Sequence, residues 1–333
     1  MRGLLIALAF VLAPVAHASQ APAEDGYYLH WNRDHTERAP RPVYPLTDEE
    51  ARVMDSYFLD YENGYLEKVT FFHGGKPSPH GDYGAHALVR RKTDTLITEW
   101  FENAAGERVV NSNGVWEVRY VCTGHGYWTT KITLGPDGQP VNVGGYAKLM
   151  VTRDRKGRRV HEIRFDAAGE QVAEHNGFPM AFFAFDGNDF ATYRQNQAPD
   201  GTLMNGENGF AEVRFHFDAQ GNFLSEQVFD ADGKPKNFPS GFADIRYSNF
   251  DRFGRPHRVD VKTETGEPFG DMPVIERSYL PSGQRAGQRY FKLDGTPGMD
   301  GSGAHEVRFI YDDTGKRTGI KRFDVSGAEI KAE

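Results

Sequence analysis

Apolar and polar side chains alternate one by one along many short stretches of this chain. In the stretch 212–217, Val213, Phe215 and Phe217 would face one side, and the polar residues between them would face the other. The stretch 306–311 repeats this pattern. Alternation with a period of two is typical of a β-strand with one dry face and one wet face. The pattern therefore predicts many short strands and does not indicate long amphipathic helices.

Each alternating stretch runs into a short turn of the form Asp-x-x-Gly. The turns from Asp218 to Gly221 and from Asp312 to Gly315 are clear copies. The Asp side chain can accept hydrogen bonds from backbone amides ahead of it, which starts the turn. Gly adopts the positive φ that a type I turn with a G1 bulge requires. We therefore expect tight β-hairpins at these points.

The turns recur at a fixed period of about 32 residues, which is typical of a repeat protein. The glycines of this series are Gly106, Gly138, Gly169, Gly201, Gly233, Gly266, Gly295 and Gly327. A second series, with Gly145, Gly209 and Gly241, runs in phase with the first, and each member opens a strand. Each unit is therefore expected to contain two strands, two tight turns and a short Gly/Pro loop.

The composition agrees with a fold of short strands. The chain of 333 residues holds 37 Gly, its aromatic fraction is 13% and its hydrophobic fraction is only 38%. We predict an all-β fold of tandem antiparallel β-hairpin repeats, forming a meander or β-solenoid-like sheet with a short N-terminal helical cap. The sequence leaves open whether the sheet coils or closes into a ring.

The [Phe/Tyr]-Asp-x-x-Gly turns, combined with Gly-[Tyr/Phe]-Ala strand openings, resemble the tandem aromatic–glycine hairpin repeats of bacterial surface proteins. The YD repeats of the RHS group are similar, and MORN repeats are more loosely so. The resemblance covers the chain from about Phe71 to Phe323. It implies a role as a shell or binding scaffold, and motifs that are structural, with no catalytic residues.

The first 18 residues have the features of a secretory signal peptide. Arg2 supplies a positive charge, Leu4–Val15 is apolar, and Ala16–Ala18 fits a cleavage site of the A-x-A type. We therefore expect export to the periplasm or exterior of a bacterium, with a Gram-negative host favoured. No later segment approaches the roughly 18 consecutive apolar residues of a membrane span, so none is expected after cleavage.

Residues 19–65 lie outside the repeat and are expected to form an N-terminal strap and cap, followed by the repeat domain at 66–333. The segment from Thr47 to Glu50 has the pattern of a capping box, which predicts a short helix that extends to about Ser56. Such a cap would cover the first edge of the sheet.

Charge and cysteine content exclude several classes of protein. The net charge of −8 and the pI of about 5.9 argue against a nucleic-acid partner, because phosphate contacts need clustered Lys and Arg. Cys122 is the single cysteine, so the chain has no intramolecular disulfide. The sequence has no P-loop, dinucleotide fingerprint or H-E-x-x-H motif, and we therefore predict no cofactor.

Candidate functional residues are sought where a unit departs from the repeat. The first departure contains His73, His80 and His86, with Asp82 among them. Imidazoles and a carboxylate are competent ligands for zinc or copper. The spacing matches no named metal motif, and His80 sits in a Pro/Gly loop where a solvated histidine is common, so the favoured interpretation is that these histidines bind no metal.

The second departure replaces the expected turn with Cys122 and His125. A thiol beside an imidazole can act as an activated nucleophile. However, Cys122 aligns with Phe217 and Tyr311, which occupy dry-face positions. The favoured interpretation is therefore a small buried side chain.

The third departure contains His175, Asp186 and Asp189, near Tyr193. Paired carboxylates can perform acid–base chemistry or bind Ca²⁺. They also suit a plain turn, which is the favoured interpretation.

Export, repetition and the absence of a catalytic motif predict a non-catalytic envelope scaffold that binds a glycan, peptide or protein partner. Trp116, Trp128 and Tyr193 are its candidate ligand-binding side chains. The alternative is an exported hydrolase or lyase, with His86, His125, His175 and Asp186 as catalytic residues. A second alternative is a metal-binding protein that uses His73, His80 and His86.

Overall fold

The computed structural model describes residues 24–32, 41–81, 83–123, 127–173, 180–187, 190–198 and 200–330. These residues form 24 β-strands and one short α-helix. The predicted signal peptide at 1–18 lies outside them. No helix in the described part of the chain is both long enough and apolar enough to cross a membrane.

The described residues up to 198 carry the helix α1 (Asp48–Ala51) and fifteen strands. These strands are β1 (Gly26–Asn32), β2 (Arg41–Pro45), β3 (Ser56–Glu62), β4 (Tyr65–His73), β5 (Lys76–Pro77), β6 (Ala87–Lys92), β7 (Leu96–Glu102), β8 (Arg108–Val109), β9 (Glu117–Cys122), β10 (Trp128–Leu134), β11 (Lys148–Arg153), β12 (Arg159–Phe165), β13 (Gln171–Val172), β14 (Met180–Phe185) and β15 (Ala191–Asn196).

Residues 200–330 carry nine further strands. These are β16 (Glu212–Phe217), β17 (Phe223–Phe229), β18 (Asp244–Phe250), β19 (Pro256–Lys262), β20 (Val274–Tyr279), β21 (Arg285–Phe291), β22 (Glu306–Tyr311), β23 (Arg317–Phe323) and β24 (Glu329–Ile330).

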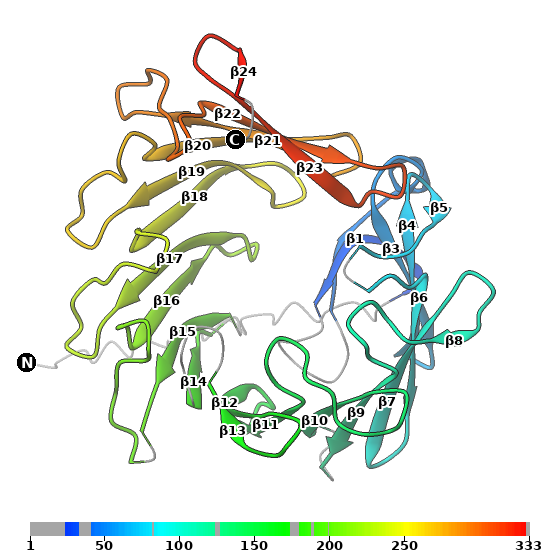
Figure 1. The fold of residues 1–333 in the computed structure, drawn as a ribbon. Helices are drawn as coiled ribbons and strands as arrows, with labels where there is room; N and C mark the ends of the chain where they lie inside the picture. The colour runs from blue at the N-terminus through cyan, green and yellow to red at the C-terminus, as the bar shows by residue number, and fades with distance from the viewer. Residues whose placement is uncertain are drawn as a thin grey trace, which may run out of the picture.

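The long strands form one antiparallel meander, as predicted. Each long strand from β3 onward pairs with the next along the chain, while β1 pairs with β3 and the edge strand β2 pairs with β1. The strip of sheet curls round on itself (Figure 1). Among the described strands, no ladder joins the two ends, so the sheet is not closed and forms an open coil.

The repeated turns have the predicted chemistry. In the turn after β16, Asp218 Oδ1 accepts hydrogen bonds from the backbone amides of Gln220 (2.9 Å) and Asn222 (2.8 Å). The pairing register shifts between His216 and Phe217, which is the expected bulge. All eight glycines of the 32-residue series have φ between 75° and 89°, a region that other L-residues rarely adopt. The hairpin repeat is therefore confirmed.

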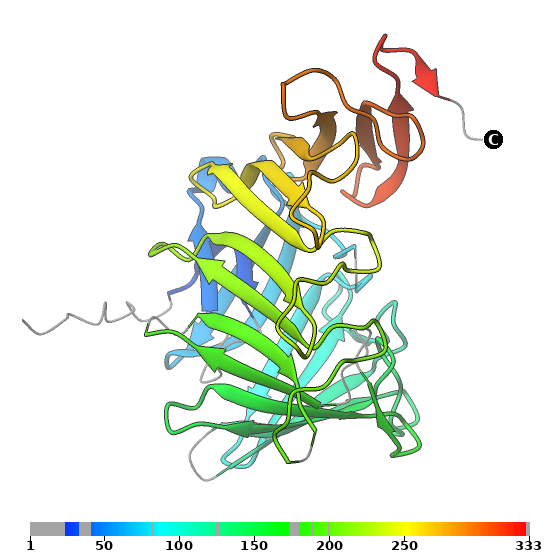
Figure 2. The same cartoon turned by 90° about the vertical axis from the view of Figure 1, so that its left-hand side faces the viewer.

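The two edges of the sheet differ. Short turns such as 218–222 join strands at one edge, and longer Gly/Pro loops such as 230–243 join them at the other (Figure 2). Neighbouring long loops are connected by asparagines: Asn142 Oδ1 accepts from the Ala167 amide and Asn205 Oδ1 from the Ala231 amide, both at 2.8 Å. These hydrogen bonds stabilise the loop edge in addition to the backbone hydrogen bonds between the strands.

The coil is held by a seam, where the short turns of the C-terminal units meet the N-terminal elements. The Tyr44 hydroxyl on β2 donates to Asn222 Oδ1 (3.2 Å). Phe253 packs with Leu29 and Met54 in a buried cluster. Farther along, the turn between β22 and β23 reaches the end of β4 (Figure 1). The seam thus joins segments that are far apart in sequence.

The helical cap is present but shorter than expected. Thr47 Oγ1 accepts from the Glu50 amide, and the Glu50 carboxylate accepts from the Thr47 amide, so the capping box is confirmed. The helix ends at Ala51, whereas we predicted about Ser56, because Ser56 already pairs with Phe72 in the sheet. The boundary predicted at residue 65 falls in the β3–β4 hairpin.

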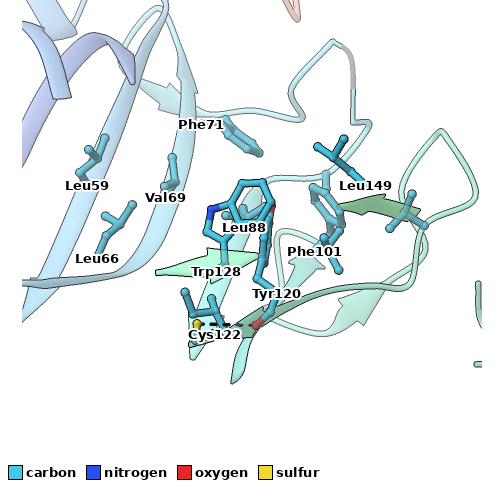
Figure 3. Close-up of a cluster of buried hydrophobic side chains, with 14 of the residues drawn as sticks. Leu59, Leu66, Val69, Phe71, Leu88, Phe101, Tyr120, Cys122, Trp128 and Leu149 are labelled. Atoms are coloured by element: carbon cyan, nitrogen blue, oxygen red, sulfur yellow. Dashed lines mark hydrogen bonds between the residues drawn. The ribbon is translucent and has the colours of Figure 1, made fainter. Parts of the chain in front are cut away.

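The main hydrophobic core lies on the face of the sheet that points into the coil, which we call the inward face. Directly opposed residues on antiparallel strands share a face, and Val69 lies opposite Leu88, which lies opposite Phe101. Side chains of β3 and β4, such as Leu59, point toward those of β9–β11, such as Leu149 (Figure 3). The main core therefore lies on the inward face of the sheet between β3 and β11.

Candidate functional site

The register places charged residues on the inward face as well as apolar ones. Arg90 lies opposite Glu99, and the two form a buried ion pair with 3.2 Å between Nε and Oε1. The Tyr120 hydroxyl donates to Glu99 Oε2 at 2.9 Å. Val151 lies opposite Glu162, so β12 also turns a carboxylate inward. Groups of this kind are costly to bury unless they are paired.

A pocket of about 310 Å³, which we call the seam pocket, lies where the two ends of the coil meet. Its N-terminal lining consists of Leu29, His30, Asp55, Ser56, Tyr57, Phe71, Phe72, His73, Ser78, Pro79, His80 and Gly81. Its C-terminal lining consists of Ser282, Gly283, Gln284, Thr314 and Gly315. The Asp55 amide donates to the Ser282 carbonyl at 2.8 Å, which fixes the two linings to each other.

An Asp–His pair stands in the seam pocket. Asp55 Oδ1 and His73 Nδ1 are 2.5 Å apart. Burial raises the pKa of Asp55, while the hydrogen bond and charge of His73 oppose this shift. When Asp55 is ionised its carboxylate can only accept, so the hydrogen of this bond then lies on His73 Nδ1. This arrangement is competent for general acid–base chemistry.

An aromatic wall connects the seam pocket to a second pocket of about 270 Å³. The His80 ring stacks on Tyr83, with centroids 4.7 Å apart, and its Nε2 is 3.0 Å from the Tyr57 hydroxyl. Tyr83 in turn contacts Phe101. The second pocket is lined by Tyr83, Phe101, Asn111, Asn113, Val115, Val118, Tyr120, Lys131, Thr133, Val143 and Tyr146.

A third pocket, of about 280 Å³, lies on the inward face between β12 and β17; we call it the arginine pocket. Its lining consists of Arg159, Glu162, Arg164, Phe183, Phe185, Ala191, Arg194, Phe215, Phe217 and Phe223. Glu162 is only 3% exposed and pairs with Arg159 (Nη1–Oε2 3.2 Å) and with Arg164 (Nη2–Oε1 2.7 Å). Two guanidinium groups thus share one carboxylate.

The three predicted ligand-binding side chains lie in different surroundings. Trp128 is 4% exposed and packs edge-on against Tyr120 in the core (Figure 3). The Trp116 ring is covered by the Arg108 guanidinium, 4.3 Å from its centroid. Tyr193 lies opposite Arg214 on the outward face. None of the three lines any of the three pockets described above.

Of the four predicted catalytic residues, the structure describes His86 and Asp186, and it does not bring these two together. His86 is half-buried before β6, at the loop edge. Asp186 starts the short turn after β14, at the other edge, where its Oδ1 accepts from the Phe190 amide at 3.0 Å. His125 and His175 lie outside the described residues.

Cys122 is confirmed as a buried core residue. Its side chain is 8% exposed, and Sγ donates to the Tyr120 carbonyl at 3.8 Å (Figure 3). Burial raises the pKa of this thiol, which is the opposite of what an activated nucleophile requires.

Of the three histidines proposed as metal ligands, His73 and His80 both line the seam pocket, and His86 does not. Over the ranges that the structure describes, no three His, Cys, Asp or Glu side chains are grouped so that they could hold a metal ion. Asp82 lies outside these ranges.

Sequence reasoning missed Asp55 and the arginines of β12. Asp55 falls in the strap, where no repeat template exists for comparison. Glu162 and Arg164 did carry a signal, since they occupy dry-face positions of an alternating strand. A charged residue at a dry-face position of a strand indicates either a buried ion pair or a ligand site.

No family model matches the chain, and no curated protein gives a significant match. Among solved structures, a Tc holotoxin pore from Photorhabdus luminescens aligns with a TM-score of 0.27 and 9% identity over 87% of this chain. The TcdB2–TccC3 complex gives 0.28 and 10% over 88%. This chain spans only 18% of either toxin chain. A porin-like protein from Bacteroides uniformis gives 0.29 and 9%, over 68% of this chain and 83% of its own. These scores are low, so the functional argument rests on the geometry of this chain.

Proposed function

We propose that this protein is an exported binding scaffold that holds a glycan, peptide or protein partner against the inward face of its coiled sheet. The observation that carries the proposal is the contrast between the two faces. The outward face carries the same Glu-x-Arg arrangement in more than one unit, whereas the pockets of the inward face have different linings. Variation on a constant frame is how repeat proteins build binding surfaces.

The outward arrangement is a Glu-x-Arg pair at the start of a strand. Glu306 pairs with Arg308 at 2.6 Å, and Arg308 in turn covers the Phe323 ring, 4.3 Å from its centroid. Glu212 and Arg214 repeat this arrangement with Phe229. These side chains satisfy one another, so their recurrence is explained by the stability of the sheet.

The inward pockets have no such common pattern. The second pocket combines tyrosines with Lys131, Thr133 and two asparagines, whereas the arginine pocket combines guanidinium groups with phenylalanines. Aromatic walls with a few placed polar groups are typical of ligand sites. The predicted signal peptide supports a location in the periplasm or outside the cell.

Binding of the purified chain from residue 19 onward to arrays of envelope glycans and peptides tests the proposal. We expect Tyr146→Ala, in the second pocket, to weaken binding of a ligand found in this way. Tyr193→Ala, on the outward face, is the matched control and should leave binding unchanged. Loss of binding with Tyr193→Ala alone would place the site on the wrong face and refute the proposal.

A second candidate function, an exported hydrolase or lyase, is favoured by the Asp55–His73 pair. Turnover assays on envelope polymers should then show activity that Asp55→Asn and His73→Gln both abolish while ligand binding persists. Activity that survives both substitutions would exclude this pair as the acid–base group.

A further inference from the structure

We propose that the second pocket binds an acidic sugar residue, with the sugar carboxylate at Lys131 and the sugar hydroxyls at Asn111 and Thr133. The proposal deepens the function above and rests on it, because it names the ligand class of one inward pocket. Two observations support it: polar groups that line this pocket without a partner in the described chain, and an aromatic lining that suits one sugar ring.

Lys131 supplies the positive charge. On β10 it lies opposite Tyr120 of β9 and Leu149 of β11, which are both buried core residues, so its side chain lies on the inward face. It is half-buried and lines the second pocket. Within the described residues, its ammonium has one interaction, with the Tyr146 ring, whose centroid is 6.0 Å away. The charge is therefore available to a ligand.

The carboxylates on the inward face are held by arginines instead. Glu99 pairs with Arg90, and Glu162 pairs with Arg159 and with Arg164. Neither glutamate lines the second pocket, and no Asp or Glu is present among the residues of that lining. A ligand carboxylate that enters the pocket would therefore meet a positive charge and no acidic side chain in the pocket wall.

Asn111 adds a buried hydrogen-bond donor. Its side chain is 6% exposed, and its Oδ1 accepts from the backbone amides of Asn113 and Val115, both at 2.9 Å. Because these bonds occupy the oxygen, the NH₂ group is the other end of the amide, and it has no hydrogen-bond partner among the described residues. Buried polar groups are normally hydrogen-bonded, so this group indicates a ligand that accepts from it.

Thr133 adds a buried hydroxyl two positions after Lys131 on the same strand. It is 4% exposed and lies opposite the buried Val118, so it shares the inward face with Lys131. In the part of the chain that the structure describes, its hydroxyl makes no hydrogen bond. A hydroxyl can both donate and accept, as sugar hydroxyls do. The strand thus presents an ammonium and a hydroxyl to the same pocket.

The rest of the lining favours a sugar over a peptide. Tyr146 and Phe101 offer apolar ring faces, and the volume of about 270 Å³ suits one sugar ring. Lysine binds a carboxylate as a point charge, while amide and hydroxyl side chains pair with sugar hydroxyls. An acidic peptide side chain would satisfy the ammonium but would bring no hydroxyls to Asn111 and Thr133. An acidic sugar satisfies all three groups.

Fluorescence anisotropy with the full mature chain tests this assignment. The acidic probes are a labelled oligogalacturonate and a labelled oligomannuronate, and their neutral counterparts are the methyl esters of the same oligosaccharides. A labelled peptide in which glutamates alternate with phenylalanines is the peptide probe with the same carboxylate chemistry. We expect the better-bound acidic oligosaccharide to bind roughly tenfold or more tightly than its ester, with affinity that falls as salt rises.

Three variants separate the roles of the two side chains on β10. Lys131→Gln should weaken the acidic oligosaccharide roughly tenfold and leave the ester unchanged, because it removes only the charge. Lys131→Arg keeps the charge and should keep the preference for the acid. Thr133→Val has nearly the same shape without the hydroxyl, so it should weaken acid and ester alike, by roughly threefold or more.

Two matched controls lie on the outward face of the same strands. Lys148 precedes the inward Leu149 on β11, and Thr130 lies opposite Met150, which is 42% exposed. Lys148→Gln and Thr130→Val should leave the binding of every probe unchanged. Circular dichroism shows whether each variant is folded, and Thr133→Val and Lys131→Arg keep the test decisive if Lys131→Gln is not.

Several outcomes would overturn the proposal. These are equal affinity for acid and ester, an effect of Lys148→Gln as large as that of Lys131→Gln, or a failure of both acidic oligosaccharides to bind. Tighter binding of the acidic peptide, lost in Lys131→Gln, would assign the pocket to a peptide and refute the sugar. If a ligand from the arrays needs Tyr146 but not Lys131, the acidic sugar is refuted while the scaffold function stands. A chain that binds no array ligand refutes the scaffold function itself.

Discussion

Asp251→Ala should both weaken a hairpin and open the seam. Asp251 Oδ1 accepts from the backbone amides of Phe253 (2.9 Å) and Arg255 (3.1 Å), and Oδ2 accepts from Arg255 Nε at 2.6 Å. The same turn presents Phe253 to the seam cluster with Leu29 and Met54. The alanine variant therefore loses the hydrogen bonds of the turn and weakens the packing of Phe253 against Leu29 and Met54.

The expected loss can be estimated in two parts. Two backbone hydrogen bonds contribute about 1 kcal/mol each. The ion pair with Arg255 is partly exposed and adds about 0.5–1 kcal/mol. The turn itself thus accounts for about 2–3 kcal/mol. Partial exposure of Phe253, which is 9% exposed in the native chain, adds about 1–2 kcal/mol.

Asp154→Ala is the matched control. Asp154 makes the same three bonds, to the amides of Lys156 and Arg158 and to Arg158 Nε, at 2.9, 3.0 and 2.7 Å. Its turn lies outside the seam and contacts Tyr127 instead. Both variants should therefore lose the turn contribution, and only Asp251→Ala should also lose the seam contribution.

Urea denaturation measures the total loss of unfolding free energy, and hydrogen exchange measures directly whether the seam opens. The Asp55 amide donates to the Ser282 carbonyl across the seam, so its exchange reports whether the seam is closed. We expect faster exchange of the segment that contains Asp55 in Asp251→Ala but not in Asp154→Ala. Equal losses of stability, together with unchanged exchange at Asp55, would refute the view that this turn holds the coil.

The pH dependence of this contribution has a defined sign. Burial disfavours ionisation of Asp251, but the hydrogen bonds from Arg255 and Phe253 outweigh it, and the pKa is lowered. A lowered folded-state pKa gives stability that is present above the unfolded value near 3.9 and is lost as pH falls through the folded value. Acid unfolding should therefore be less steep in Asp251→Asn than in the wild type below about pH 4.

Three further predictions concern packing and the thiol. Gly254→Ala should destabilise the chain by several kcal/mol, because a Cβ at this position would overlap the Tyr44 ring. Gly233 has open space around it, so Gly233→Ala should cost only about 1–2 kcal/mol, for its positive φ. The urea midpoints of the two variants compare these losses of stability. Leu88→Ala, at a fully buried core position, should cost about 3 kcal/mol in the same assay. The Cys122 thiol, whose pKa is raised by burial, should react slowly with a thiol reagent in the folded chain at neutral pH and quickly in denaturant; fast labelling of the native chain would contradict its placement in the core.

The hairpins could be predicted because their chemistry is local. A turn such as Asp218–Gly221 needs only an acceptor, a residue that tolerates positive φ and a bulge, and all three lie within a few positions. The capping box at Thr47 is local in the same sense. The helix was predicted too long because the competing partner of Ser56 is Phe72, in the next strand.

The seam could not be predicted because its contacts join distant segments. Tyr44 and Asn222 are 178 positions apart, and neither residue departs from what a strand end or a turn would normally carry. The hydrogen bond of the Asp55 amide to the Ser282 carbonyl depends on the curl of the sheet in the same way. Such contacts depend on how many units complete one turn of the coil, and no single unit encodes that number.

The repeat nevertheless narrows the search for functional residues to the positions that depart from it, and the structure shows which kind of departure is informative. Departures in residue type, such as Cys122 and Asp186, prove to be a core side chain and a turn residue. Departures in phase are more informative, because a charge on the dry face of a strand must be neutralised from within the coil. At Arg90 the chain supplies that partner itself. At Arg159 and Arg164 the chain supplies Glu162 as a shared partner, so the inward charges of β12 are also neutralised from within the coil.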